Sequence, residues 1–155
     1  MEGGEDGWRK PPSPTPNDVG AVDETTMRGQ LTAARVARLG TVRPGGTPHI
    51  VVCCFALAGD VVYSAVDDKP KTTVALQRLR NLTTNAAASL LVDHYDEDWT
   101  ALWWIRLDGL GRVIADGSEH ERAVVLLCGK YEQYRHRRPT GPVIAIDVAR
   151  WVAWP

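Results

Sequence analysis

Long hydrophobic runs, lysines and cysteines are all scarce in this sequence of 155 residues. No apolar stretch approaches the roughly 18 to 20 residues that a membrane-spanning helix needs. The first six residues are net acidic, whereas a signal peptide begins with basic residues, so we expect a cytoplasmic protein with no membrane partner. Cys53, Cys54 and Cys128 suit neither a disulfide framework nor a zinc site, and we interpret them as apolar core filling.

A dense basic surface is also missing. The net charge is −1, but residues 1–26 hold six acidic and two basic side chains, which leaves 16 basic and 13 acidic side chains from Met27 onward. This small basic surplus would suit an anionic ligand, yet it is too weak to predict a nucleic-acid partner. Because residues 1–26 are also rich in glycine and proline, we predict a disordered tail there and one folded domain over residues 27–155.

Hydrophobic patterning predicts a mainly β, α+β domain. The predicted helices cover residues 31–39, 71–82 and 118–131, and the predicted strands cover residues 41–43, 48–57, 61–66, 87–92, 99–114 and 142–154. Ser118 and Glu121 have the spacing of a capping box at the start of the third helix. Strands joined mainly by hairpins, with three short helices, favour a six-stranded antiparallel barrel over a doubly wound parallel sheet.

The predicted 99–114 strand carries two features of interest. Alternation places Trp103 on the core side and Trp104 on the opposite side, where it could contact a bound ring or anchor an interface between two copies. Gly109 and Gly111 have the spacing of part of a nucleotide-binding fingerprint. They lack its third glycine and its following helix, so we do not interpret them as a nucleotide site.

Two of the four lysines, Lys69 and Lys71, stand together where a strand is followed by a helix. The N-terminus of a helix offers unpaired backbone N–H groups and partial positive charge. Together with the lysines and the hydroxyls of Ser64 and Thr72, it would hold a phosphate group. The alternative is that both lysines are ordinary solvated charges beside neighbouring aspartates, and the residues alone leave both interpretations open.

Several stretches of the chain resemble the split β-barrel flavin and deazaflavin oxidoreductases related to pyridoxamine 5′-phosphate oxidase. The general likeness lies in residues 37–49, 62–71, 79–82 and 88–93 and in Asn85. Residues 65–71, 93–99 and 102–106 are similar to an actinobacterial branch assigned to coenzyme F420, a deazaflavin. The resemblance implies a split β-barrel fold over residues 27–155 and hydride transfer between F420 and a small organic substrate. Alternatives are an FMN-dependent oxidoreductase and a carrier that binds the cofactor without turnover.

The resemblance also implies positions for the cofactor. The backbone of Val51, Val52 and Cys53 would lie along the tricyclic ring, and Ser64, Lys69 and Lys71 would hold the phosphate. The family is dimeric, so the resemblance implies a homodimer in which each site is completed by the partner chain. Val51 replaces a basic residue of some oxidases, and this difference argues against pyridoxal phosphate chemistry.

No catalytic acid, base or nucleophile stands out in the sequence. His49 could donate a proton near the ring or be an ordinary edge histidine. His94 stands among Asp93, Asp96, Glu97 and Asp98, a run that is more typical of a solvated turn than of a metal site, so we expect no metal.

Overall fold

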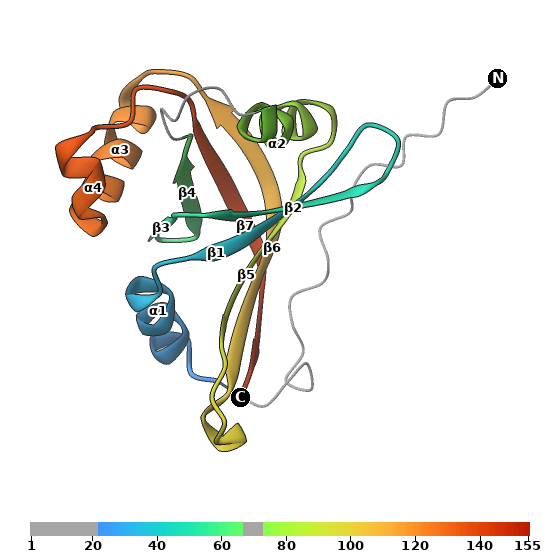
Figure 1. The fold of residues 1–155 in the computed structure, drawn as a ribbon, viewed down its shortest axis with the longest axis vertical. Coiled ribbons are helices and arrows are strands. Elements are labelled where there is room, and N and C mark those ends of the chain that lie inside the picture. The colour runs from blue at the N-terminus through green and yellow to red at the C-terminus, as the bar shows by residue number, and fades with distance from the viewer. Residues whose placement is uncertain (1–21, 67–72) are drawn as a thin grey trace.

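The computed structural model describes residues 22–66 and 73–155, which form a curled β-sheet with helices around it (Figure 1). In chain order the elements are α1 (Glu24–Ala33), β1 (Ala37–Val42), β2 (Pro48–Cys53), β3 (Ala56–Ala58), β4 (Val61–Ala65), α2 (Thr73–Thr84), β5 (Ala87–His94), the 3-10 helix η1 (Trp99–Ala101), β6 (Trp103–Ile114), α3 (Ser118–Lys130), α4 (Glu132–His136) and β7 (Val143–Trp154). None of the helices in this part of the chain is long and apolar enough to cross a membrane.

The seven strands form one antiparallel sheet in the order β2-β1-β5-β6-β7-β4-β3. β2 and β3 are therefore the two end strands, although only residues 54 and 55 separate them in the chain. A flat sheet of seven strands would hold its ends about 29 Å apart, far more than a two-residue link can span. The sheet must curl until its ends meet, and this confirms the predicted split barrel.

The prediction of six strands and three helices was wrong, because the structure has seven strands and four α-helices in its described residues. The predicted 48–57 strand is divided at Cys54 and Phe55. Here the backbone N–H of Phe55 donates to the hydroxyl of Tyr131, and the same hydroxyl lies 2.9 Å from the carbonyl oxygens of Phe55 and Arg35. These bonds take Phe55 out of the strand ladder, so the chain can change from one edge of the sheet to the other.

The link formed by Cys54 and Phe55 is the junction between β2 and β3, and the ring of Phe55 fills its inner side. Phe55 is fully buried, and the ammonium nitrogen of Lys130 lies 3.9 Å from the centre of its ring. That ammonium also donates to the carbonyl oxygen of Leu31 on α1. Burial, followed by the nearby charge of Arg35, lowers the pKa of Lys130 to about 8. The junction thus ties α1, α3 and the two edge strands together.

The helix predicted over residues 31–39 is also wrong. α1 ends at Ala33, and Ala37–Val42 is strand β1, in which buried Ala37, Leu39 and Thr41 alternate with more exposed neighbours. This alternation has the period of a strand, and it overrides the helical spacing of the flanking apolar residues. α1 begins at Glu24, so the last three residues of the predicted tail belong to a helix, whereas residues 1–21 lie outside the described residues.

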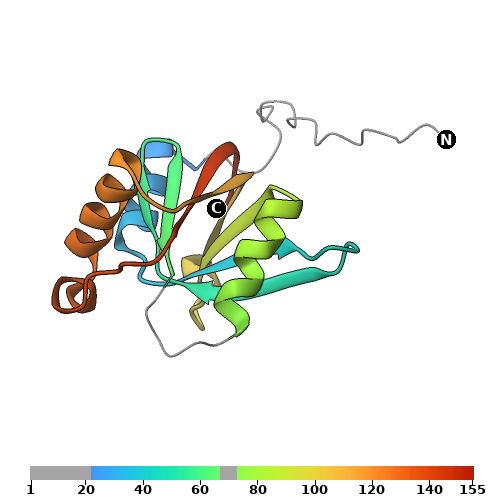
Figure 2. The same ribbon diagram turned by 90° about the horizontal axis from the view of Figure 1, so that it is seen from above.

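α2 lies across one end of the curled sheet (Figure 2). Asn81 is completely buried and donates from Nδ2 to the hydroxyl of Thr41 on β1, 2.9 Å away. Leu82 packs over Gly111 of β6, where a Cβ atom would lie 2.5 Å from Cδ2 of the leucine. These contacts hold the C-terminal half of α2 against the inner face of the sheet.

α3 and α4 cover the side of the sheet formed by β3 and β4 (Figures 1 and 2). Ala123, Val124 and Leu127 of α3 are buried in a second apolar cluster with residues of β3, β4 and β7. The predicted capping box is wrong. Gly117 is the N-cap and offers no side chain, and the carboxylate of Glu121 pairs with Arg138 instead.

Gly109 and Gly111 are required by packing on β6. A Cβ atom at Gly109 would lie 2.1 Å from the carbonyl oxygen of Asp147 on β7, at a bulge between Asp108 and Gly109. Because this obstacle is backbone rather than a flexible side chain, only glycine fits. The paired glycines therefore allow β7 and α2 to approach β6 closely.

We expect Gly109→Ala to lower the unfolding temperature by about 5–10 °C, because the two backbones must separate. Thermal unfolding followed by circular dichroism measures the effect. Gly129→Ala is the matched control, since Gly129 lies on α3 with nothing within 4 Å of the added Cβ, and its unfolding temperature should stay equal or rise. Equal unfolding temperatures for Gly109→Ala and the unmodified protein would contradict the packing account.

Candidate functional site

The predicted ring-binding strand is β2. Its only partner among the described strands is β1, so the backbone groups along its other edge have no strand partner there. Along β2, Val52 points outward and is 65% exposed, Val51 is half-buried and Cys53 is buried. A free strand edge can offer backbone donors and acceptors to a polar, planar ligand. Residues 51–53 therefore lie on a strand edge that no other described strand covers.

Ser64 lies near the end of β4, close to the junction that ends β2. β3 and β4 pair as far as Ala56 opposite Tyr63, so Ser64 comes next to the Cys54–Phe55 link. Its side chain is 2% exposed, and within the described part of the chain its hydroxyl has no hydrogen-bond partner. A buried hydroxyl without a partner costs about 1–3 kcal/mol, so this oxygen is suited to a ligand. The predicted phosphate residues Lys69, Lys71 and Thr72 follow β4 and lie outside the described residues.

A second group of buried polar side chains lies between the β1–β2 hairpin and α2. His49 of β2 and Arg78 of α2 are both buried, and neither His49 Nδ1 nor Arg78 Nε has a partner in the residues described. Burial, followed by the charges of Arg43 and Arg78, lowers the pKa of His49, so its imidazole is neutral at physiological pH. His49 thus lies on an edge strand, as one of the two interpretations expected, but its side chain is buried there.

Sequence analysis missed Arg78 and Asn81. The available signal was their spacing of three on α2, which places an arginine and an amide side chain on the helix face that carries Leu82. A charged residue on an inward helix face requires a partner. The structure places Asn81 against Thr41 of β1 and Arg78 near His49 of β2.

Trp104 lies apart from the other candidate residues. It pairs with Asp93 of β5 and Trp154 of β7. This pairing lies two residues along β6 from Arg106, which is in the row that joins Val52, Arg38 and Leu91 across β2, β1 and β5. Three strand spacings of about 4.8 Å separate β6 from β2. Within one chain, the structure therefore does not bring Trp104 to the ring-binding strand.

The outward face of β2, β1, β5 and β6 carries exposed apolar side chains beside two ion pairs, Arg38–Asp93 and Arg106–Asp108. Ile50 and Val52 are 69% and 65% exposed, and Leu91 and Leu110 are more than one third exposed. A hollow of about 420 Å³ is lined by residues of all four strands, among them Gly40, Ile50, Ser89 and Asp108. Exposed apolar area of this kind marks a contact surface in soluble proteins.

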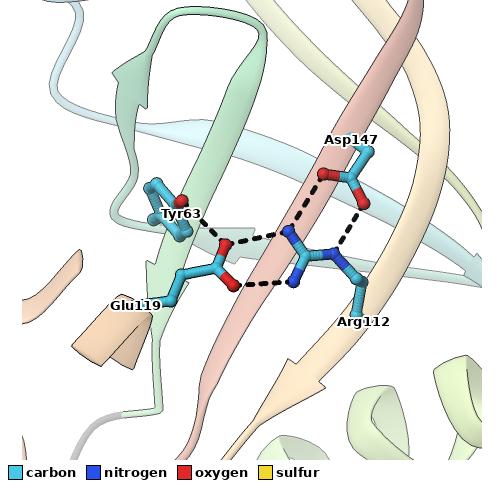
Figure 3. Close-up of polar contacts among 4 residues, drawn as sticks. All are labelled: Tyr63, Arg112, Glu119 and Asp147. Atoms are coloured by element: carbon cyan, nitrogen blue, oxygen red, sulfur yellow. Dashed lines mark hydrogen bonds and ion pairs between the residues drawn. The ribbon is translucent and has the colours of Figure 1, made fainter. Parts of the chain in front are cut away.

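The most extensive charged network links four elements (Figure 3). Arg112 of β6 donates to both carboxylate oxygens of Asp147 on β7 and of Glu119 on α3, and the hydroxyl of Tyr63 on β4 donates to Glu119. Every charged group in this network has an opposite partner. We therefore assign it the structural role of fixing the start of α3 on the sheet.

The network has a defined pH dependence. Hydrogen bonds from Arg112 and then from Tyr63 lower the pKa of Glu119 from 4.5 to about 2. A lowered carboxyl pKa stabilises the folded protein fully above the unfolded value and loses this effect as the pH falls through the folded value. The contribution of Glu119 should thus be present above about pH 4.5 and disappear between pH 4.5 and 2.

We expect Glu119→Gln to lower the unfolding temperature at pH 7 and to make it fall less steeply between pH 4.5 and 2. The reason is that the amide has no proton to gain in this range. Thermal unfolding across the pH series measures the difference. Glu132→Gln on α4, whose carboxylate contacts only the exposed His136 among the described residues, is the control and should follow the unmodified protein. Parallel curves for Glu119→Gln and the unmodified protein would refute the assignment.

The acidic run after β5 forms a structured turn. Asp96 accepts from the backbone N–H of Asp98, and Asp98 accepts from the backbone and hydroxyl of Thr100 at the start of η1. Within residues 22–66 and 73–155, no group of three or more histidine, cysteine, aspartate or glutamate side chains is placed to hold a metal ion. The carboxylates of Asp96 and Asp98 thus serve the turn itself.

Comparison with known proteins identifies the fold. The model of the family described as pyridoxamine 5′-phosphate oxidase matches residues 24–155. A conserved hypothetical protein from Mycobacterium tuberculosis is similar in structure, with a TM-score of 0.72 and 17% identity over 89% of this chain and 87% of the other. An FAD-binding protein from Mesorhizobium loti has a TM-score of 0.63 and 18% identity over 85% of this chain and 94% of the other.

A third similar structure is that of the heme storage protein from Vibrio cholerae. Its TM-score is 0.64 and its identity 12%, over 81% of this chain and 89% of the other. No curated protein shows significant sequence similarity to the chain. At identities below 20%, these structures establish the split barrel, while their ligands belong to those proteins.

Proposed function

Since the chain belongs to the pyridoxamine 5′-phosphate oxidase family, we propose that it is an oxidoreductase that binds a flavin-type cofactor in the split barrel. More specifically, we propose that the cofactor is the deazaflavin F420 and that a hydride passes between it and a small organic substrate. The sequence motifs at residues 65–71, 93–99 and 102–106 support this choice of cofactor.

The buried hydroxyl of Ser64 is the observation that carries the proposal. It has no partner in the described residues, and it stands beside the end of β2 and just before the segment with Lys69 and Lys71. A phosphate oxygen would satisfy this hydroxyl, and the two ammonium groups would add charge-assisted hydrogen bonds. The residues present therefore fit an anionic, phosphate-bearing cofactor.

The chain's own residues would bind and shield the reacting ring. The free edge of β2 at residues 51–53 would hydrogen-bond the polar edge of the ring, while the apolar side chains of the barrel would exclude water from it. When bound, the cofactor supplies the hydride chemistry. Because the cofactor would supply the chemistry, the site needs no protein acid. This agrees with His49 of β2, which is buried and neutral.

FMN is the second candidate cofactor, and the FAD-binding relative with the same fold favours it. Titration of the purified protein with F420 and with FMN, followed by the absorption and fluorescence of each, decides between them. Our proposal requires tighter binding of F420. Reduced F420 should then be oxidised in the presence of an electron-poor alkene or quinone, whereas tight binding without oxidation across such a panel would indicate a carrier.

Replacement of Ser64 should change cofactor binding and protein stability in opposite directions. We expect Ser64→Ala to weaken F420 binding about tenfold, because one hydrogen bond to a charged phosphate is lost. The same change should raise the unfolding temperature of the cofactor-free protein by about 2–4 °C, because a buried hydroxyl without a partner is removed. Fluorescence titration and thermal unfolding provide the two measurements. Unchanged affinity would show that the hydroxyl does not contact the cofactor.

The same F420 titration tests the phosphate contacts proposed for Lys69 and Lys71. The double variant Lys69→Ala, Lys71→Ala should bind F420 at least about thirtyfold more weakly, since two charge-assisted contacts are removed. The double variant Arg9→Ala, Lys10→Ala removes the same charge from the predicted N-terminal tail, so it is the matched control and should bind normally. A loss of no more than twofold in the double variant would overturn the phosphate assignment.

We further propose that two copies associate through the outward face of β2, β1, β5 and β6. A single barrel with β2 as an exposed edge covers only one side of a ring that lies along it. A second copy placed on this face would bury Ile50 and Val52 and would complete the site.

Charge placed on this face should separate the copies. We expect Ile50→Glu to convert a dimer to a monomer and to weaken F420 binding, because a carboxylate would be buried in an apolar contact. Folding should be retained, since the side chain is 69% exposed. Val125→Glu is the matched control, because Val125 is 55% exposed on α3 and lies outside the proposed contact. Light scattering reports the mass, and a dimeric Ile50→Glu protein would refute this interface.

A further inference from the structure

The connection from β5 to β6 lies at the end of the sheet opposite α2 (Figure 1). Residues on both sides of this connection line an aromatic hollow. Its volume is about 350 Å³, which suits a small ligand. Five of its seven lining residues carry aromatic rings, and the other two are Asp93 and Leu102. The rings belong to His94, Tyr95, Trp103, Trp104 and Trp154.

Strand pairing holds these rings in place. Trp104 stands opposite Asp93 on β5 and opposite Trp154 on β7, so the three side chains share one face of the sheet. His94 stands opposite Trp103, and their rings are stacked with centres 6.0 Å apart and planes inclined by 22°. The arrangement therefore exists before any ligand binds, which lowers the entropic cost of binding.

The charge around the hollow is negative. Residues 93–106 contain four carboxylates and one arginine, Arg106, which forms an ion pair with Asp108. Asp93 is oriented by an ion pair with Arg38 of β1, and a carboxylate oxygen of Asp96 lies 3.8 Å from Nε2 of His94. Carboxylates and the faces of aromatic rings both attract cations, and both disfavour anions.

The kinds of polar group present narrow the choice of cation. An indole N–H can donate a hydrogen bond but cannot accept one, and Asp93 already accepts from Arg38. A primary ammonium group needs three hydrogen-bond acceptors, and the ring faces that make up most of the lining supply none. A quaternary ammonium group has no N–H donor, and its methyl groups can pack directly on the rings.

We propose that this hollow is a binding site for a small quaternary ammonium ion. The site is formed by residues of one chain and stands apart from the junction of β2 and β4, so it does not depend on the cofactor proposed above. Trp104 and Trp154 supply the ring faces, and Asp93 with its acidic neighbours supplies the attractive charge.

The test compares choline with 3,3-dimethylbutan-1-ol, a neutral molecule of the same shape. Binding to the full-length protein is measured by calorimetry and by the quenching of tryptophan fluorescence. We expect choline to bind at least tenfold more tightly than the alcohol. Equal affinities would show that the hollow recognises only apolar shape, and undetectable binding of choline would also overturn the proposal.

Substitutions then locate the site. Trp104→Ala and Trp154→Ala should each weaken choline binding at least tenfold, and Trp154→Phe should recover part of the loss. Trp154 is 41% exposed and next to the last residue, so this variant decides the question even where Trp104→Ala fails to fold. Trp99→Ala is the matched control, since Trp99 is 72% exposed on η1 but does not line the hollow. Choline binding that is unchanged in Trp154→Ala, or reduced as much in Trp99→Ala, would refute the site.

Discussion

The hydroxyl of Tyr131 holds the place where the chain passes from one edge of the sheet to the other. It bonds both backbone groups of Phe55 and also contacts the carbonyl of Arg35, so it satisfies polar groups that the strand ladder leaves unpaired. Burial raises the pKa of Tyr131 to about 12, so the hydroxyl keeps its proton at any physiological pH. The curl of the sheet, and with it the whole barrel, depends on this junction.

The same junction determines where the candidate cofactor site lies. Because β2 and β3 meet there, the free edge of β2 and the buried hydroxyl of Ser64 come together although they lie on opposite ends of the strand order. A polar atom that is buried without a partner lowers stability, and such atoms in folded proteins mark functional positions. Within the described part of the chain, Ser64, His49 and Arg78 carry such atoms. Ser64 lies near the end of β4, whereas His49 of β2 and Arg78 of α2 lie near each other.

Much of the fold was predictable because its strands alternate clearly in burial. The core side of β6 followed from Ile105 and Leu107, and the hairpins followed from their turn residues. The break at Phe55 was not predictable, because the residue that causes it, Tyr131, is 76 positions away in the chain. In the same way, Asn81 and Arg78 could be placed on a helix but not against β1, since only the tertiary structure brings α2 to Thr41.

The order of strands also has a consequence for biosynthesis. β7 is the last strand in the chain, yet it lies between β6 and β4 in the sheet. While residues 143–154 are still inside the ribosome, the β3–β4 hairpin has no neighbour to join and β6 has a free edge. The barrel can therefore close only after β7 has emerged, and until then the two open edges are exposed to the aggregation that chaperones prevent.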